Sequence, residues 1–516
     1  MSANIKICIT TPEFPPDQWG GLARTAERVA RCGAESGLEV HVAVFRVADG
    51  PLVLLDENRV DSARDGLIIH RITLGRERAG ETRELWDCPH NLTLQMMYQS
   101  LEMLHRDVGF ELFHSFFLYP VGYVTGLLAK RFRARSVTTI VGNDVKKYPF
   151  SPEKAALCSS GLENADLVVA LSGELLDMAD ALSPIREKAR VVYNSVEIPA
   201  EGWSPKRDAG TERLGAATNN RGHLPRLARV PMAGTVGSTH VQTAHGHRGS
   251  TAIDPFAQAD SDDKSSRRVK NLNDSSTDSR SLSTAMPAHA VPTSPSAPEG
   301  SRRTLPSESL ESSPSDTSRD DESAPAEPSF APFRIGCAGI FKYAKGLPYL
   351  FKAVAGLSER FPLVLELRGT LRDSERDVYR QMVTRTGIEK HLRLLEPLSH
   401  DDIPRWLRSL DLFVLPSVSE GCPNILMEAM ASGVPCVATK TGAVEDLMLD
   451  GVSGLSVPWG ESAALAAAME RVIQDPGLAM SLGTAARQRM RLFSSQREQR
   501  AWKSVYAQLE ALLHDR

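Results

Sequence analysis

Two glutamates in one short stretch, Glu420 and Glu428, have a spacing that suggests chemistry. The stretch reads "SEGCPNILMEAMASGVPC" and begins at Ser419. Pro423 stands where the first residue of a helix is expected, because the N–H that proline lacks would find no helical acceptor there. Gly433 then closes the helical pattern. The sequence therefore predicts one carboxylate before a helix N-terminus and a second carboxylate one turn inside the helix.

The start of this predicted helix is a candidate binding site for an anion or a sugar oxygen. The amides of Asn424 and Ile425 are expected to lack helical acceptors at the positive end of the helix. Each of the two carboxylates can accept two hydroxyl hydrogen bonds, and a ribose and a hexose linked by a diphosphate present such hydroxyls. The spacing suits a nucleotide sugar laid across the helix N-terminus. The alternative is that Glu428 is an ordinary first-turn glutamate that complements the helix dipole.

The elements that must position this helix follow an α/β pattern in both halves of the chain. Continuous apolar strands alternate with helices, which indicates parallel sheets covered on both faces. We therefore predict two doubly wound Rossmann-like domains with a ligand cleft between them, at the carboxyl ends of the strands. The predicted strands are residues 5–10 and 39–45, "ELFHSF", "SVTTIVG", "ADLVVALS" and "ARVVYNS" in the first half, and residues 333–340, 363–369, 410–417 and 435–440 in the second.

A long segment between the two halves has a different composition. Ser, Thr, Pro, Asp and Arg dominate from about residue 199 to about residue 332, and "SSPSDTSRDDESAPAEPS" is typical of it. Such a segment cannot bury enough apolar area to offset its chain entropy, so we predict a disordered insert. Its "DSDD" run is expected to be solvated charge. The predicted organisation is an acceptor-side domain at residues 1–199, the insert at 200–332 and a nucleotide-sugar-binding domain at 333–516.

Composition excludes several classes of protein. The net charge of −4 gives no global basic field for nucleic acid. The seven cysteines form no C-x-x-C pair and have no zinc-ligand spacing, which fits a reducing compartment. No long apolar h-region follows Met1, and the apolar stretch at 116–129 is too short to span a bilayer. We predict a cytoplasmic protein.

The segment at residues 485–503 is rich in arginine. These arginines suit peripheral contact with the inner membrane face, and a solvated helix face is the alternative.

The glutamate stretch resembles the signature of the family 4 glycosyltransferases, which are retaining enzymes of the GT-B fold. The family pattern is E-G-x-P/G-x-x-x-x-E-A-M-A-x-G-x-P-V, and this chain has "EGCPNILMEAMASGVPC". The resemblance covers both halves and fails only in the insert. It implies that Glu420 faces the transferred sugar and that Glu428 holds the nucleotide ribose. The amides of Gly421 and Cys422 would lie at the donor, and the last helix would cross back to the first domain.

Two further segments resemble donor-site loops of the family. "TPEFPPDQWGGLART" is similar to its first strand and Gly-Gly loop, in which Gly20 and Gly21 would let backbone approach the diphosphate or acceptor. A tight turn before a helix is the alternative. "FKYAKGLPYL" is similar to the loop whose lysine reaches the diphosphate, here Lys345. The arginine usual five residues earlier is replaced by Ile340. Lys342 would be the second cation, or the chain has none.

The acceptor side of the resemblance is weaker. "TIVGNDVKKY" is similar to the H/R-G-x-D segment of the family, with Asn143 and Asp144 in place and Val141 at the His or Arg position. His114 in "ELFHSF" resembles a histidine at a strand end, and a structural role is the alternative for it. "YNSVEIP" is similar to the hinge between the two domains, with Asn194 in the usual position.

The resemblance implies transfer of a hexose-type sugar from a UDP- or GDP-linked donor, with retention. Lys345, with Lys342, and the helix-end amides would stabilise the charge that grows on the leaving diphosphate. No cofactor and no metal are expected, because the family usually needs no metal and the chain has no ordered D-x-D motif. The departing phosphate itself would take the proton of the acceptor, so no carboxylate base is needed. A sugar-nucleotide epimerase or hydrolase and a non-catalytic binding protein are the rival classes. The sequence leaves the donor sugar, the acceptor, the linkage, the role of the insert and the oligomeric state open.

Overall fold

The computed structural model describes residues 5–16, 20–49, 54–64, 66–76, 91–204 and 331–515. All of them lie in one compact unit formed by Met1–Arg229 and Phe330–Arg516. The predicted disordered insert at 200–332 falls almost wholly outside the described residues, so it stays a prediction.

The first half is built on an eight-stranded sheet with the order β3-β4-β2-β1-β5-β6-β7-β8. Its pairings are parallel except that of β3 with β4, which is antiparallel. The strands are β1 (Lys6–Thr11), β2 (Glu39–Asp49), β3 (Leu54–Arg64), β4 (Leu67–Arg76), β5 (Leu112–Phe116), β6 (Arg135–Ile140), β7 (Leu167–Ala170) and β8 (Ala189–Val191). The sequence analysis missed β3 and β4. The polar run "LLDENRVDSAR" of β3 has no apolar pattern that could announce a strand.

Helices of the first half follow most of these strands. They are α1 (Gly21–Glu35), α2 (Asn91–Val108), α3 (Tyr123–Phe132), α4 (Asn143–Lys146), α5 (Pro152–Asn164) and α6 (Gly173–Leu182). α1 begins directly after Gly20 and buries a stripe that includes Leu22, Ala26 and Val29. This stripe fixes which residues of α1 point away from the core of the first half, and Arg24 is one of them.

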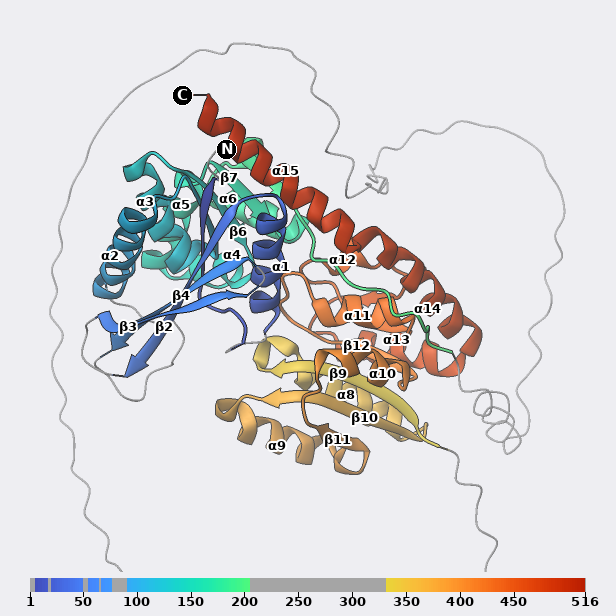
Figure 1. Cartoon of the computed structure of the whole chain (residues 1–516). Helices are drawn as coiled ribbons and strands as arrows, with labels where there is room; N and C mark the ends of the chain where they lie inside the picture. Colours follow the sequence, from blue (N-terminus) through green and yellow to red (C-terminus); the bar gives the residue numbers. More distant parts are fainter. Residues whose placement is uncertain are drawn as a thin grey trace, which may run out of the picture. The chain divides into compact units, whose positions relative to one another are not determined.

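The second half contains a six-stranded, wholly parallel sheet with the order β11-β10-β9-β12-β13-β14. Its strands are β9 (Phe333–Phe341), β10 (Leu363–Leu371), β11 (Leu392–Leu395), β12 (Leu412–Leu415), β13 (Cys436–Thr439) and β14 (Leu455–Val457). Its helices are α8 (Leu347–Ser358), α9 (Arg376–Thr386), α10 (Ile403–Arg408), α11 (Asn424–Ser432), α12 (Val444–Leu447), α13 (Ser462–Gln474) and α14 (Pro476–Met490). The prediction of two doubly wound α/β domains is confirmed (Figure 1).

The last helix, α15 (Ser495–His514), packs on the first half. Trp502 and Tyr506 are buried in the same core as the strands of the first sheet. α15 contacts α1 and β6, and Figure 1 draws it as the long red helix beside α1. Arg135 of β6 donates to the carbonyl oxygen of Leu512 at 2.6 Å, which fixes the end of the helix. None of the helices in the described ranges combines the length and apolar character that a bilayer span requires.

The chain on either side of the long undescribed segment attaches to one turn of the second half. The indole of Trp203 donates to the carbonyl oxygen of Leu410 at 2.8 Å. Arg334, at the start of β9, donates its amide to Asp411 Oδ2 at 2.7 Å and its guanidinium to the carbonyl oxygen of Ser409 at 2.8 Å. Residues 203 and 334 are therefore anchored to neighbouring residues of the second half.

Candidate functional site

A cavity of about 630 Å³ is lined by residues of both halves. Its walls include the start of α1, the residues that follow β6, the ends of β9 and β10, the loop after β9, and the start of α11. Every residue predicted for catalysis or donor binding lines it, and so does Asn143. These residues are Glu420, Lys345, Lys342, Glu428, Gly421, Cys422, Asn424, Ile425, Gly20 and Gly21.

α11 begins one residue later than the sequence analysis expected. Pro423 is the N-cap rather than the first helical residue, with φ −77° and ψ 95°. Its carbonyl oxygen accepts from the amides of Leu426 and Met427 at 3.1 and 3.3 Å. The amides of Asn424 and Ile425 precede these bonds at the positive helix end, as predicted. Gly433 ends the helix with φ +80°, a conformation that glycine tolerates.

Lys345 and Glu420 meet at one side of the cavity. Lys345 Nζ lies 2.7 Å from Glu420 Oε1, and the hydroxyl of Ser417 donates to the same oxygen at 2.6 Å. Gly346 has φ +65°, and a Cβ there would lie 1.9 Å from the carbonyl oxygen of Pro416. The glycine therefore lets the lysine loop pack directly on the end of β12. A lysine ammonium and a carboxylate share a site at the N-terminal end of α11.

Glu428 lies in the cavity wall with its side chain 12% exposed. Arg24 Nη1 of α1 lies 3.3 Å from Glu428 Oε1, and His400 Nδ1 lies 3.8 Å from the same oxygen. Burial raises the pKa of Glu428 to about 7, and the guanidinium groups of Arg24 and Arg28 act in the opposite direction. This carboxyl therefore depends on its neighbours to stay ionised near neutral pH.

The backbone of the two halves touches at Gly421. A Cβ on Gly421 would lie 2.0 Å from the carbonyl oxygen of Val141, so only glycine fits. The Gly421 carbonyl oxygen accepts from the amide of Ala443 at 2.8 Å. The amide of Gly442 donates in turn to the carboxylate of Glu174 at the start of α6. The loop that carries Glu420 is thus held between the two halves.

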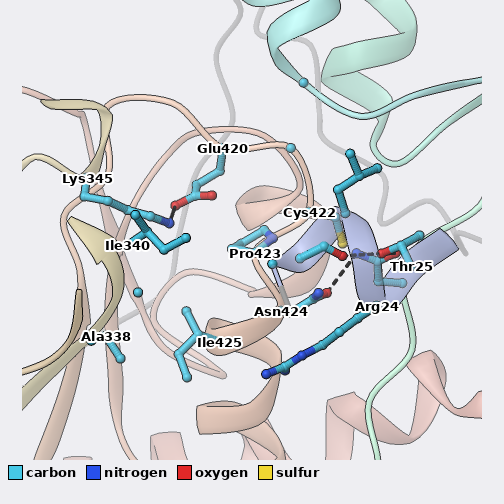
Figure 2. A pocket seen from close by; sticks show the side chains of 18 of the residues that line it. Arg24, Thr25, Ala338, Ile340, Lys345, Glu420, Cys422, Pro423, Asn424 and Ile425 are labelled. Atoms are coloured by element: carbon cyan, nitrogen blue, oxygen red, sulfur yellow. Dashed lines mark hydrogen bonds and ion pairs between the residues drawn. The ribbon is translucent and has the colours of Figure 1, made fainter. Parts of the chain in front are cut away.

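A chain of polar side chains runs from α1 to the start of α11. The hydroxyl of Thr25 donates to Asn194 Oδ1 at 3.1 Å, and Asn194 Nδ2 donates to Asn424 Oδ1 at 2.8 Å. Figure 2 shows Thr25 and Arg24 on one side of Asn424, and Lys345 with Glu420 on the other. The sequence analysis matched Asn194 only to the hinge between the domains. In the structure it links α1 to the N-terminus of α11, the candidate anion site.

Two of the predicted acceptor-side residues lie outside the cavity wall. His114 is fully buried, with hydrogen bonds to the hydroxyls of Tyr506 at 3.0 Å and Thr139 at 2.8 Å. Burial lowers its pKa to about 3. Asp144 is also buried, and it accepts from the amides of Val141 and Gly142. Asp144 therefore stabilises the loop after β6, whereas His114 joins β6 to the last helix, α15.

Three further side chains of the cavity wall are Ile340, Lys342 and Cys422, while Asp144 lies behind the wall. Burial raises the pKa of Asp144 to about 6, against the backbone amides that lower it. Ile340, which replaces the usual arginine, lines the cavity and is 55% exposed. Lys342 lines the same wall. Burial raises the pKa of the Cys422 thiol to about 12, so this cysteine is a neutral wall residue.

Other residues of the cavity wall were not identified from the sequence. Arg24 and Thr25 follow the glycine pair after two intervening residues, but their partners Glu428 and Asn194 lie 404 and 169 residues away in the chain. Arg368 of β10 and Trp406 of α10 also line the cavity and were not identified. The Arg368 guanidinium carbon lies 5.3 Å from the centroid of the Trp406 ring. Polar residues after the strand "LVLELRG" were the available signal, since ligands bind at strand ends.

Comparison with known proteins identifies both halves. The model described as Glycosyltransferase Family 4 matches residues 19–198, and the model described as Glycosyl transferases group 1 matches residues 332–475. The curated relatives include a D-inositol 3-phosphate glycosyltransferase of Corynebacterium glutamicum, 30% identical over 35% of this chain and 43% of the relative. Another, from Pseudarthrobacter chlorophenolicus, is 32% identical over 30% of this chain and 37% of the relative. The matched segments thus span less than half the length of these relatives.

Solved structures share the fold at low sequence identity. Sucrose-phosphate synthase from Thermosynechococcus elongatus has a TM-score of 0.61 and 16% identity, covering 99% of this chain and 100% of that one. HepE of Anabaena in complex with UDP-glucose has a TM-score of 0.58 and 16% identity, covering 98% of this chain and 100% of that one. The predicted GT-B fold is therefore confirmed.

Proposed function

The chain belongs to the family 4 glycosyltransferases, and from this membership we propose that it transfers a hexose-type sugar from a nucleoside diphosphate sugar to an acceptor hydroxyl. The observation that carries the proposal is the placement of Glu420, Lys345 and Glu428 around the N-terminus of α11 in one cavity. Such a helix end favours phosphate. Lys345 adds a cation for the diphosphate. Glu420 and Glu428 add carboxylates that can accept from the hydroxyls of the hexose on one side of the diphosphate and of the ribose on the other.

In this proposal the donor lies across the start of α11. Its ribose hydroxyls bond to Glu428, and its diphosphate meets the amides of Asn424 and Ile425. Lys345 faces the diphosphate and keeps Glu420 within 2.7 Å, so that Glu420 can accept from the hexose hydroxyls. HepE, which shares the fold, holds UDP-glucose, and this supports a uridine nucleotide as the first donor to test.

The proposed reaction proceeds with retention. The bond between the anomeric carbon and the diphosphate oxygen breaks while the acceptor oxygen bonds to the same face of that carbon. The acceptor proton passes to the departing phosphate oxygen, so no protein base is needed. Charge grows on the diphosphate during this step. Lys345 and the amides at the start of α11 are placed to stabilise this charge, and Lys342 is the candidate for a second cation.

We propose that the reaction needs no bound metal ion. The positive charge that a metal would supply at the diphosphate is offered by the lysines and the helix end. Activity unchanged by EDTA is the expected result. An absolute requirement for added Mg²⁺ or Mn²⁺ would contradict this part of the proposal.

The acceptor is proposed to enter beside Asn143, Val141 and the Gly20–Gly21 loop, which the first half contributes to the cavity. The curated relatives are named for D-inositol 3-phosphate, so a cyclitol phosphate is the first acceptor to test. Glycans, lipids and other small molecules with free hydroxyls follow.

The test is turnover of a panel of UDP- and GDP-sugars with and without these acceptors, monitored by nucleotide release and by NMR of the anomeric product. Acceptor-dependent release with a retained anomeric configuration is expected. Equal release without any acceptor would favour a hydrolase or epimerase. Nucleotide-sugar binding without any turnover would favour a binding protein. Glu420→Gln serves as the control that has the cavity but lacks the proposed carboxylate.

A further inference from the structure

One side chain of the first half reaches the proposed ribose site of the second half. Arg24 lies in the first turn of α1, and its Nη1 atom lies 3.3 Å from Glu428 Oε1. Its side chain is 25% exposed and lines the cavity. Figure 2 shows it extended from α1 beneath Ile425 of α11. The charge of Glu428 is therefore balanced by a residue that belongs to the other half of the molecule.

Only one oxygen of the Glu428 carboxylate takes part in these contacts. Arg24 and His400 both approach Oε1. Arg24 Nη1 also lies 3.1 Å from His400 Nδ1, so the guanidinium, the imidazole and Glu428 Oε1 form a triangle of close contacts. Both contacts are to Oε1, so in the proposed complex the ribose hydroxyl bonds to Oε2. An arginine that orients the carboxylate in this way is compatible with a bound ribose.

Other charged groups near Glu428 are engaged elsewhere. Arg28 of α1 bonds to Glu498 of α15 at 3.1 Å. On α10, Arg405 pairs with Asp402 and Arg408 pairs with Glu201. On α14, which also contacts α11, Arg487 bonds to the carbonyl oxygen of Pro199 and Arg489 bonds to that of Leu447. His400 faces Asp401 and Glu197 as well, and its pKa is lowered by burial and then by Arg24. Arg24 is therefore the main charge partner of Glu428.

We propose, on the basis of the donor site proposed above, that Arg24 is a positioning residue that keeps Glu428 ionised and oriented for the donor ribose. The ribose hydroxyls need an acceptor, and an ionised carboxylate offers all its lone pairs for this purpose. Because α1 supplies the charge, donor affinity depends on the contact between the halves. The donor site of the second half is complete only when α1 is seated on it.

The proposal predicts how donor binding changes with pH, because it depends on the protonation state of Glu428. Burial already raises the pKa of Glu428 to about 7, and Arg24 is the first of the groups that lower it. Removing Arg24 should therefore move the pKa upward, by roughly one to two pH units for the loss of an opposite charge at this distance. Donor binding that needs the ionised form then weakens at pH 6.5 and recovers at pH 9.

The test measures the dissociation constant of UDP-glucose, or of the nucleotide sugar that binds best in the panel, from pH 6 to pH 9. An intact nucleotide sugar is used because its diphosphate does not titrate in this range. We expect Arg24→Gln to weaken binding by about 10-fold or more at pH 6.5 and by less than about 3-fold at pH 9. Arg24→Lys should restore most of the affinity, since it keeps the charge.

Two controls separate this role from a general loss of structure. Arg28→Gln removes another ion pair of α1, the one with Glu498, and should shift the pH profile of donor binding much less than Arg24→Gln does. In a Glu428→Gln background, Arg24→Gln should leave the pH profile of binding unchanged, because the titrating group is gone. Thermal unfolding of each variant shows whether it is folded.

Several results would overturn the inference. Arg24→Gln with the wild-type pH profile, or an equal loss at pH 6.5 and pH 9, would show that Arg24 does not act through the Glu428 proton. Tighter binding at every pH would show that Arg24 blocks the site. If the wild-type protein bound no nucleotide sugar at all, the proposed function would fail as well. If the wild-type protein binds and the profile does not move, only the role of Arg24 is wrong.

Discussion

Lys345 Nζ lies 2.7 Å from Glu420 Oε1, so the cation proposed for the diphosphate and the carboxylate proposed for the sugar stabilise each other inside the cavity wall. Both side chains are largely buried, at 18% and 12% exposure. Removing either one leaves the other without its charge partner in a site where an unpaired charge is costly. The two residues should therefore behave as a unit when they are mutated.

Lys345→Ala should lower turnover by about 100-fold or more, the scale for losing one preorganised donor that stabilises transition-state charge. Steady-state kinetics with the best nucleotide sugar measures this loss. Lys440→Ala is the matched control, because that lysine pairs with Glu445 near the surface of the same half. A Lys345→Ala enzyme with wild-type turnover would remove Lys345 from the mechanism.

The missing arginine at Ile340 gives a second prediction. If Lys342 supplies the second cation, Lys342→Ala should cost turnover about as much as Lys345→Ala, because its long side chain can reach the same diphosphate. Ile340 is 55% exposed in the cavity wall, so an arginine fits there. Ile340→Arg should then restore activity to the Lys342→Ala enzyme. Unchanged turnover and donor affinity in Lys342→Ala would show that one cation and the helix end suffice.

The two glutamates should affect different kinetic parameters. Glu428→Ala should chiefly raise the KM for the donor, because ribose contacts are alike in the ground and transition states. Glu420→Ala should chiefly lower kcat, because the sugar that it contacts changes shape during the reaction. Initial rates over a range of donor concentrations separate the two effects. If both variants changed KM and kcat equally, this division of roles would be wrong.

The α/β pattern and the glutamate motif could be read from the sequence because they depend on local signals. Apolar strands such as "LVLELRG" and the glycine at the end of α11 can be recognised from a few consecutive residues. The strand β3 was missed because its residues are mostly polar, and Pro423 was placed one position too far into the helix. A proline fits both the N-cap and the first helical position, so sequence alone does not distinguish them.

The contacts between the halves could not be read from the sequence. Arg24 and Glu428 are 404 residues apart, and no local pattern joins them. The same holds for Thr25, Asn194 and Asn424, whose hydrogen bonds depend on how the two halves meet. His114 shows the reverse case. It matches a family position near the site, but the structure places it in the core beneath Tyr506.

The segment between Trp203 and Arg334 should be removable. Trp203 belongs to the packed part of the second half, so a replacement must keep it. We expect that replacing residues 205–329 with a short Gly/Ser linker keeps the melting temperature and donor affinity, because both ends attach beside Leu410 and Asp411. A matched variant that also carries Trp203→Ala should be destabilised. Insoluble protein, or loss of nucleotide binding in the first variant, would contradict the prediction.

His114 should make the protein less stable in acid. Its folded pKa of about 3 lies below the usual value of 6.5. Between these two pH values the unfolded chain binds a proton at this histidine and the folded protein does not. Stability therefore falls as the pH drops through 6.5, by about 2 kcal/mol at pH 5 relative to neutral pH. Thermal unfolding of the wild type and of His114→Gln at pH 7.5 and pH 5 measures the difference. The variant should lose less stability on acidification.

Asp144 should act in the opposite direction over the same range. Its folded pKa of about 6 lies above the usual 3.8, so the folded protein holds a proton that the unfolded chain releases. Stability from this group is lost as the pH rises through 6 and regained below it. Asp144→Asn should therefore steepen the acid loss due to His114. An Asp144→Asn protein with a flatter pH dependence would contradict the raised pKa of Asp144.

The most direct test of the central claim is a crystal structure with a bound nucleoside diphosphate sugar. The claim predicts phosphate oxygens within hydrogen-bond distance of the amides of Asn424 and Ile425 and of Lys345 Nζ. It also predicts ribose hydroxyls on Glu428, with Arg24 still on the other oxygen of that carboxylate. A nucleotide bound elsewhere, or one whose phosphates point away from the start of α11, would contradict the account.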